Sequence, residues 1–196
     1  MSKKKTILRV AAALFSKHGY NNTTMSELSR ITEAAEGTIF YHFTNKEELF
    51  ISVLQNAKDL ILGEIENYLD AREFGSGLDM IEGIVTRYLH MAETLEEQFL
   101  LVHRHYPREL AMINTICGEH FEAFYNALLD IFERAIVLGQ QDGSILALPA
   151  RKNAMILLST VDGIVRFKTW KLWEANQLVD ELIRTVRKML KTDLRI

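Results

Sequence analysis

Residues 23–50, TTMSELSRITEAAEGTIFYHFTNKEELF, decide the fold of this chain, because their pattern predicts two short helices, a turn between them and a third helix. Thr24 and Glu27 have the Thr-x-x-Glu spacing of a capping box, so a helix should begin at Met25. Three residues that recur at intervals of three would give this helix one apolar face: Met25, Leu28 and Ile31.

A second helix should follow a break of a few residues, within the segment GTIFYHF at residues 37–43. Its apolar face is expected to consist of Ile39, Phe40 and Phe43. Residues 44–47 and 45–48 both have the spacing of a cap that opens a long third helix. A scaffold helix, a tight turn and a short helix with a polar outer face make the helix-turn-helix shape that fits a DNA major groove.

From residue 7 to residue 50 the chain resembles the DNA-binding domain of TetR-family transcriptional repressors. The matching positions keep a fixed order and spacing, which makes the set far more specific than any one of them. They are Ile7-Leu8, Ala11-Ala12, Leu14-Phe15, Gly19-Tyr20, Thr23-Thr24-Met25, Leu28, Gly37-Thr38, Tyr41-His42-Phe43 and Lys46-Glu47-Glu48-Leu49. Beyond residue 50 the resemblance is one of length and all-helical character, as is normal for a family whose effector domains diverge.

Three positions depart from the family's pattern. Glu33 stands at a turn where the family usually has Gly, and a positive φ there would cost a Glu ~1 kcal/mol. Ala35 replaces the Ser that usually caps the recognition helix, which removes one acceptor for the free N–H groups. Phe40 replaces a Tyr that hydrogen-bonds a phosphate in many members. These departures predict that the helix-turn-helix segment, which we call the reading head, is less rigid and makes fewer phosphate contacts than usual.

The residues that should contact DNA lie on and beside the second helix. Thr38 can donate or accept a hydrogen bond or contact a thymine methyl. Glu36 either accepts a hydrogen bond from cytosine N4 or weakens non-specific DNA binding. Thr24 and Lys46 lie at helix N-termini, where backbone N–H groups add to the attraction for phosphate. The predicted DNA-binding residues are Thr24, Ala35, Glu36, Gly37, Thr38, Tyr41, His42 and Lys46.

Composition and charge are compatible with a nucleic-acid-binding protein. The 196 residues, 48% of them hydrophobic, can bury a sizeable core in one or two domains. The net charge is −3, but residues 1–50 carry seven Lys and Arg against five acids, which leaves −5 on the other 146. A basic footprint on one domain is what DNA binding needs. The segment Lys3-Lys4-Lys5 either reaches phosphate or is a solvated tail.

The sequence also favours a cytoplasmic location. No run of eighteen apolar residues exists, and Arg9 interrupts the N-terminal apolar segment that would otherwise resemble a signal peptide. Cys117 is the single cysteine, which rules out an internal disulfide and fits a reducing compartment. With no activating base beside it, Cys117 is expected to be a buried, inert thiol.

The rest of the chain predicts an all-α fold of about nine helices, since strand-like alternation is nowhere sustained. The expected helices are residues 3–18, two short helices up to residue 42, residues 46–69, residues 78–94, a segment that starts at Pro107, and residues 118–139, 150–173 and 177–191. We expect a helix-turn-helix domain over residues 1–48 and an effector-binding and dimerisation domain over residues 49–196. The helix at 46–69 would be shared, so its movement could carry a signal.

The last two expected helices hold more apolar residues than one intrachain contact requires. They either form ordinary core or meet their twofold mates in a four-helix interface, as the family resemblance also implies. We expect a homodimer, because two reading heads bind two half-sites about one DNA turn apart. The predicted interface residues are Ser159, Gly163, Phe167, Leu182, Val186 and Met189.

Large aromatic and apolar residues with a few polar groups among them are dense in the C-terminal part. Each one taken singly fits a helical core, but together they suit a pocket for an apolar or amphipathic small molecule. A family effector domain would have such a pocket. The predicted pocket residues are Phe99, His103, Tyr106, Phe121, Phe124, Tyr125, Met155, Asp162 and Trp170.

An enzyme is the alternative from another class. His103 and His105 suggest a metal site, but residues two apart on a helix point about 200° away from each other. Glu109 and His120 add no recognised metal spacing. We therefore expect no catalytic residue, metal or cofactor. Salt-dependent DNA binding without added metal would separate a regulator from a metal-dependent enzyme built on these residues.

The sequence thus predicts a dimeric transcriptional regulator, a repressor, that is released from double-stranded operator DNA by a small hydrophobic or amphipathic effector. Two variants stay open: a DNA-binding protein without an effector, and an activator.

Overall fold

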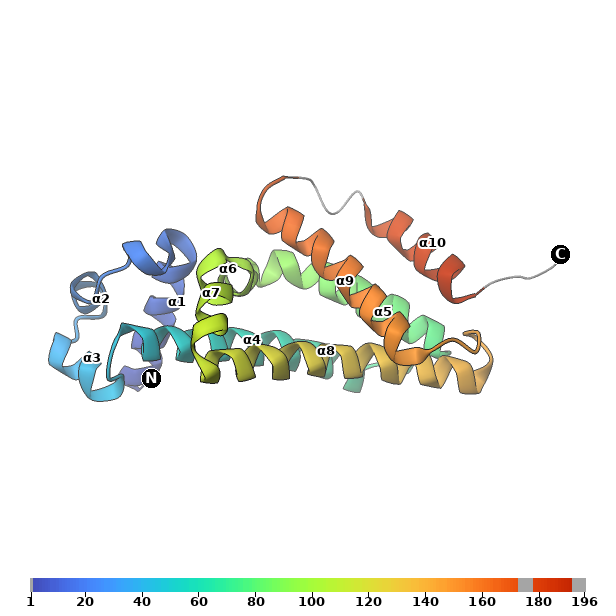
Figure 1. The fold of residues 1–196 in the computed structure, drawn as a ribbon, viewed down its shortest axis with the longest axis horizontal. Coiled ribbons are helices and arrows are strands. Elements are labelled where there is room, and N and C mark those ends of the chain that lie inside the picture. The colour runs from blue at the N-terminus through green and yellow to red at the C-terminus, as the bar shows by residue number, and fades with distance from the viewer. Residues whose placement is uncertain (1, 173–177, 192–196) are drawn as a thin grey trace. The chain divides into compact units, whose positions relative to one another are not determined.

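The computed structural model describes residues 2–172 and 178–191, and these residues form ten helices joined by short loops (Figure 1). The predicted all-α class is confirmed. The helices are α1 Lys3–Asn22, α2 Met25–Thr32, α3 Glu36–His42, α4 Lys46–Asp70, α5 Gly77–Thr94, α6 Glu96–His103, α7 His105–Ile113, α8 Thr115–Asp142, α9 Ala150–Thr169 and α10 Val179–Leu190. None of these helices is long and apolar enough to cross a membrane.

The sequence reading missed α6, which is why it predicted about nine helices. Its eight residues directly follow α5, with no glycine or proline between the two helices to mark a boundary. Helix α9 ends at Thr169 rather than at 173, and Lys171 then adopts a left-handed conformation with a φ of 55°. The predicted start of the last helix, at 177, lies outside the described residues.

The chain packs as two compact units. The first contains Met1–Ile61 and Leu95–Glu122, and the second contains Leu62–Thr94 and Ala123–Ile196. Helices α4 and α8 therefore each contribute to both units. The predicted functional boundary between residues 48 and 49 is a different division from this one, and it stays a prediction.

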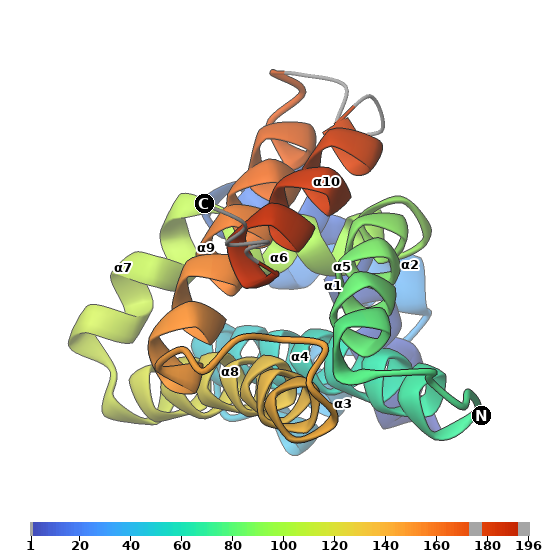
Figure 2. The same ribbon diagram turned by 90° about the vertical axis from the view of Figure 1, so that its right-hand side faces the viewer.

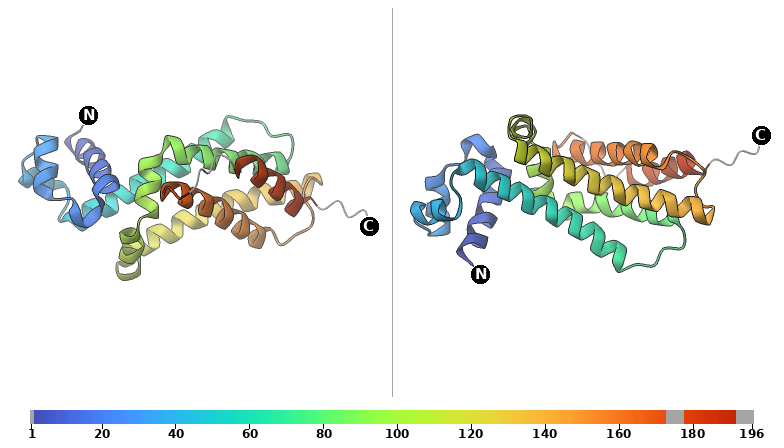
Figure 3. Two further views of the ribbon diagram at one scale, coloured as in Figure 1. Left: turned by 90° about the horizontal axis from the view of Figure 1, so that it is seen from above. Right: turned by 60° about the horizontal axis from the view of Figure 1, so that its bottom comes forward.

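The first unit is built on α1, which contacts α2, α3 and α6 (the blue and light-green helices in Figure 3). The predicted inward residues Ile7, Ala11, Leu14 and Phe15 are all buried. Gly19 was expected to stop this helix, and it does interrupt it, with a φ of 80° and a ψ of 170°. Only a residue without a Cβ adopts that backbone conformation readily.

Helix α4 begins with the second of the two predicted caps. The Asn45 side chain accepts a hydrogen bond from the Glu48 backbone N–H at 2.8 Å. The Glu48 carboxylate in turn accepts one from the Thr44 backbone N–H at 2.6 Å. Hydrogen bonding to Thr44, first to its side chain and then to its backbone N–H, lowers the pKa of Glu48. These two reciprocal bonds fix where α4 starts, directly after the reading helix.

The second unit packs α5 against α9 and α10, and Figure 2 shows α5 and α10 side by side. The N-terminus of α5 is held by the loop after α8, because Gly77 N–H donates to Asp142 and Leu78 N–H donates to Ser144. A Cβ on Gly77 would lie 2.0 Å from the backbone nitrogen of Gly139. This close approach explains why a glycine opens α5.

Candidate functional site

The turn between α2 and α3 has the backbone strain that the sequence predicted. Thr24 caps α2 by accepting a hydrogen bond from Glu27 N–H at 3.1 Å. Helix α2 ends at Thr32, and the next residue, Glu33, lies in the left-handed region with a φ of 52° and a ψ of 26°. Ala35 makes no side-chain cap for α3, as expected. The reading head therefore carries a strained turn and an uncapped recognition helix.

The recognition helix α3 buries a narrow face and exposes the rest. Ile39 and Phe43 are buried, as predicted, whereas Phe40 is 44% exposed and its assignment to the core was wrong. Ile39 and the C-cap residue Phe43 are four positions apart and share the buried face, whereas Phe40 lies at its margin. Ile31 is likewise exposed, which leaves Leu28 as the buried anchor of α2.

The outer face of the reading head is polar and ordered by side-chain contacts. Tyr41 is 84% exposed, and its ring meets the His42 ring edge-on at a centroid distance of 5.2 Å. The Ser26 hydroxyl donates to the Glu36 carboxylate at 2.6 Å, which links α2 to α3. The sequence reading missed this bond, because ten residues and the turn separate the two partners. The bond gives Glu36 a fixed direction on the surface.

Lys46 lies at the first residue of α4, and its ammonium sits 4.3 Å from the centroid of the Tyr20 ring. Burial lowers the pKa of Lys46 below its usual value. The Tyr20 ring stacks on the Tyr106 ring at 3.9 Å, with 9° between their planes. The cation is thus held against an aromatic pair.

The structure brings all eight predicted DNA-binding residues to the start of α2, to α3 and to the start of α4, and leaves each of them at least partly exposed. A Cβ on Gly37 would meet no atom within 4 Å, so the backbone of α3 is open to a close approach from outside. This arrangement is compatible with the predicted contacts, which stay predictions.

Comparison with known proteins supports the resemblance to the TetR family. Residues 7–53 match the sequence model described as "Bacterial regulatory proteins, tetR family". The chain is a TetR-family transcriptional regulator. The predicted absence of enzymatic activity is confirmed by membership of this non-enzymatic family.

Two curated relatives and one solved structure show how far the similarity extends. The regulator QacR of Staphylococcus aureus is 46% identical over 54 residues, which are 28% of this chain and 29% of QacR. The regulator AcrR of Shigella flexneri is 25% identical over 171 residues, or 83% of this chain and 76% of AcrR. A structure from Saccharomonospora viridis, solved in complex with choline, has the same fold with a TM-score of 0.82, at 17% identity over 97% of this chain and 96% of that one.

The predicted effector residues of this TetR-family regulator fall in both packing units. Phe99, His103, Tyr106 and Phe121 belong to the first unit, and the other five belong to the second. In the first unit, Phe99 and His103 are buried with ring centroids 5.7 Å apart, whereas His105 is exposed and pairs with Glu109. His103 and His105 lie on different helices, so the assumption that one helix carries both was wrong.

In the second unit, Asp162 is buried and both of its carboxylate oxygens are engaged. The buried Tyr88 hydroxyl donates to one oxygen at 2.8 Å, and Arg166 donates to the other at 3.1 Å. Burial, with Asp162 beside it, raises the pKa of Tyr125 to about 12. Met155 on α9 and Trp170, the residue that follows α9, are each 51% exposed, and their place in an effector pocket stays a prediction.

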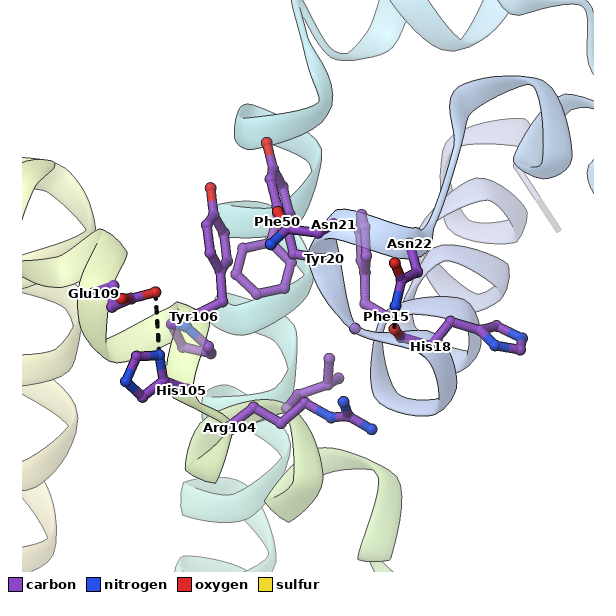
Figure 4. Close-up of a pocket in the computed structure, with 13 residues that line it drawn as sticks. Phe15, His18, Tyr20, Asn21, Asn22, Phe50, Arg104, His105, Tyr106 and Glu109 are labelled. Carbon is purple, nitrogen blue, oxygen red and sulfur yellow. Dashed lines mark hydrogen bonds and ion pairs between the residues drawn. The ribbon is translucent and has the colours of Figure 1, made fainter.

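A cavity of about 250 Å³ opens in the first unit, between the end of α1, the start of α4 and the α6–α7 junction (Figure 4). The stacked rings of Tyr20 and Tyr106, with Phe50 beside them, form its aromatic side. The Arg104 guanidinium donates to the Ser16 and Lys17 carbonyls and so ties this junction to α1. Of the predicted pocket residues, Tyr106 alone lines this cavity. The sequence could not locate this cavity, because the packing of α6 on α1 joins segments about 80 residues apart.

Two further side chains are buried in the first unit: Cys117, which the sequence predicted to be buried, and Lys58, whose burial it did not predict. Cys117 is buried, as expected, and burial raises the pKa of its thiol. Lys58 on α4 is only 2% exposed, and its ammonium lies 5.0 Å from the centroid of the Phe121 ring. Burial lowers the pKa of Lys58 to about 8.

Five of the six predicted dimer residues separate into two groups, and the sixth, Met189 on α10, is partly exposed. Leu182 and Val186 on α10 are buried within the chain, where α10 packs on α5, so they are not available to a second copy. Ser159, Gly163 and Phe167 lie on the outside of α9, and a Cβ on Gly163 would meet no atom within 4 Å. Ile156 and Trp170 extend the same stripe, since all five recur at intervals of three or four residues.

Proposed function

We propose that this TetR-family DNA-binding regulator is a cytoplasmic repressor that binds operator DNA as a homodimer and is released by a small amphipathic effector. The observation that carries the proposal is the α2–α3 pair, whose buried face is narrow and whose polar outer face presents Tyr41 and Glu36. A short helix with these properties fits a major groove.

Within this surface we assign positioning and reading to different residues. Tyr41 and His42 at the end of the recognition helix, and Lys46 at the start of α4, suit phosphate contacts, which fix the register without reading sequence. Thr38 and Glu36 suit base edges, and the hydrogen bond from Ser26 holds the Glu36 carboxylate in one direction. Thr24 caps α2 and would present its helix N-terminus to phosphate.

The exposed stripe on α9 is our candidate for the dimer interface. It combines large apolar side chains at its ends with Ser159 and Gly163 in its centre, which would allow two copies of α9 to approach closely. The choline complex of the Saccharomonospora viridis protein supports the idea that this fold accommodates a small molecule. Helix α4 runs from Lys46 to Asp70 and contributes to both packing units, so it is our candidate for the lever between effector and DNA.

Selection of bound sequences from random DNA tests the proposal, followed by measurement of affinity across salt concentrations. Lys46→Ala should weaken binding to all sequences alike and reduce the salt slope by about one unit. Lys152→Ala, on an exposed position of α9, is the matched control and should leave both unchanged. An unaltered slope for Lys46→Ala would remove this residue from the interface.

Release by an effector has its own test. A coupling free energy of about 1–3 kcal/mol would weaken operator binding roughly 5- to 150-fold, and operator DNA must then weaken the effector by the same factor. Titration of a bound compound with and without operator measures both. Equal affinities in the two titrations would contradict release.

A further inference from the structure

The position of Lys58 is unusual for a charged side chain. It lies on the part of α4 that belongs to the first unit and is 2% exposed. Among the residues that the structure describes, no hydrogen bond or ion pair involves its ammonium. Its neighbours are the Phe121 ring, 5.0 Å from Nζ to centroid, and the buried Cys117 thiol.

Within residues 2–172 and 178–191, no carboxylate forms an ion pair with this cation. The acid that acts on it electrostatically is Asp59, the next residue along α4, which is exposed and accepts a hydrogen bond from Gln55 at 2.6 Å. The lowered pKa of Lys58, about 8, has burial as its first cause, and the ammonium is still largely protonated at neutral pH. A buried ammonium without a counter-ion lowers the stability of a fold, and an apolar residue of the same size would pack there at lower cost.

Asp162, a buried carboxylate among the described residues, shows what a purely structural ion looks like. Asp162 receives hydrogen bonds from Tyr88 and from Arg166, so its charge is satisfied inside the protein. Lys58 has the same degree of burial and none of these contacts. Such a loss of stability from an uncompensated charge is expected where a bound ligand supplies the missing counter-ion.

We infer that Lys58 binds the acidic group of the effector and that this effector is a small amphipathic carboxylate. The inference rests on the proposed effector-responsive function. One buried cation is neutralised by one negative charge, which favours a carboxylate over a phosphate with its two charges. The adjacent Phe121 ring and Cys117 thiol offer an apolar wall to the carbon skeleton. Phe121 is only half-buried, so the ring beside Nζ is itself within reach of solvent.

The test compares straight-chain carboxylates, from hexanoate to hexadecanoate, with the alcohols of the same lengths. Binding is measured by thermal shift and calorimetry on the full chain, as wild type, Lys58→Met and Lys58→Arg. In the wild type the acid of the best length should bind roughly 10- to 100-fold more tightly than its alcohol, as for a hydrogen bond to a charged group. Lys58→Met should abolish this preference, and Lys58→Arg should retain part of it. Lys152→Met is the control and should behave as wild type.

A pH series adds a readout that a packing role would not produce. These acids stay ionised from pH 7 to pH 10, so their affinity for the wild type should fall above about pH 8, where Lys58 of the ligand-free protein loses its proton. The affinity for Lys58→Met should be flat. Cys117 and Asp59 are unchanged in the variant, so any common slope belongs to them or to other groups.

Three results would overturn the inference: equal binding of acids and alcohols, no binding of any acid, or an acid preference that survives in Lys58→Met. Failure of the proposed function has a different signature, because it would appear as a wild type that selects no operator DNA. Operator binding is therefore measured on the same preparations. Retained operator binding by Lys58→Met also shows that the variant is folded.

Discussion

The two packing units treat their buried charges in opposite ways. In the second unit, Asp162 on α9 is held by the Tyr88 hydroxyl from α5 and by Arg166 one turn along its own helix. In the first unit, Lys58 on α4 faces an aromatic ring and a thiol. The same unit keeps Glu33 in a left-handed conformation. The unit that carries the DNA-reading head thus tolerates two local costs, whereas both carboxylate oxygens of Asp162 in the second unit accept hydrogen bonds.

We interpret this difference as one of role: the hydrogen bonds of Asp162 stabilise the second unit, whereas the buried Lys58 and the left-handed Glu33 are kept in the first unit for binding. Natural sequences keep such irregularities mainly where function requires them. Four substitutions test the contrast, and they are ordered here by the expected size of the change in the free energy of unfolding.

The largest change is expected for Asp162→Ala. Removal of the carboxylate leaves the buried Tyr88 hydroxyl and the Arg166 guanidinium without it, so the free energy of unfolding should fall by about 3 kcal/mol. Urea unfolding at neutral pH measures this. Asp180→Ala, at an exposed position of α10, is the control and should stay within about 0.5 kcal/mol of wild type. A loss below about 1 kcal/mol would show that the paired charge does not stabilise the second unit.

Lys58→Met should change stability in the other direction, raising the free energy of unfolding by about 2 kcal/mol at pH 7. The pH dependence has a definite sign. The folded-state pKa of about 8 lies below the ordinary value of 10.5, so between these values the unfolded chain binds more protons. Wild-type stability should therefore rise from pH 8 to pH 10.5, by about 1.4 kcal/mol for each unit of pKa difference, and the variant should lack this rise.

Urea unfolding of both proteins at pH 7 and pH 10 measures the effect, and the difference between them isolates Lys58 from the other titrating groups. A destabilised Lys58→Met at pH 7 would mean that the ammonium has a structural partner in solution. In that case the contrast between the two units would disappear.

Tyr88→Phe is expected to have a smaller effect than loss of the carboxylate. The substitution keeps the buried ring and removes one donor to Asp162, which should lower the free energy of unfolding by about 1–2 kcal/mol. Tyr41→Phe removes a hydroxyl from an 84% exposed side chain and should change stability by less than about 0.5 kcal/mol. Equal effects of the two substitutions would show that the Tyr88–Asp162 bond contributes nothing measurable.

The features that the sequence predicted well are those set by neighbouring residues. The Thr24 cap of α2, the Asn45–Glu48 cap of α4 and the break at Gly19 all depend on residues within four positions of each other. Glu33 was recognised because a family resemblance marks its position as one for Gly. Capping and backbone preferences depend on neighbouring residues, so they can be predicted without knowledge of the tertiary packing.

The features that the sequence could not supply depend on contacts between distant segments. Tyr88 and Asp162 are 74 residues apart, and Arg104 reaches carbonyls 87 and 88 residues away. Lys58 looks like any lysine of an amphipathic helix until its burial is known. The exposure of Phe40 shows a second limit, because helical periodicity predicts a face but not how much of it a neighbouring helix covers.

The smallest effect is expected for Glu33→Gly, which tests the second cost in the first unit. The left-handed φ of 52° strains a residue with a Cβ by roughly 1 kcal/mol or slightly more, whereas Gly adopts it freely. Against this gain stands the extra chain entropy of Gly in the unfolded state, about 0.5–1 kcal/mol, so the net stabilisation should be at most about 1 kcal/mol.

Glu33→Asn separates the two contributions, since Asn tolerates the left-handed region without adding the chain entropy of Gly. The control is Arg30→Gly, in the last turn of α2, where the backbone is right-handed and Gly should cost about 1 kcal/mol. Thermal and urea unfolding of the three variants measure these differences. If Glu33→Gly is destabilised as much as Arg30→Gly, the turn in solution is right-handed. The backbone at Glu33 would then carry no strain. The contrast with the second unit would depend on the buried Lys58 ammonium.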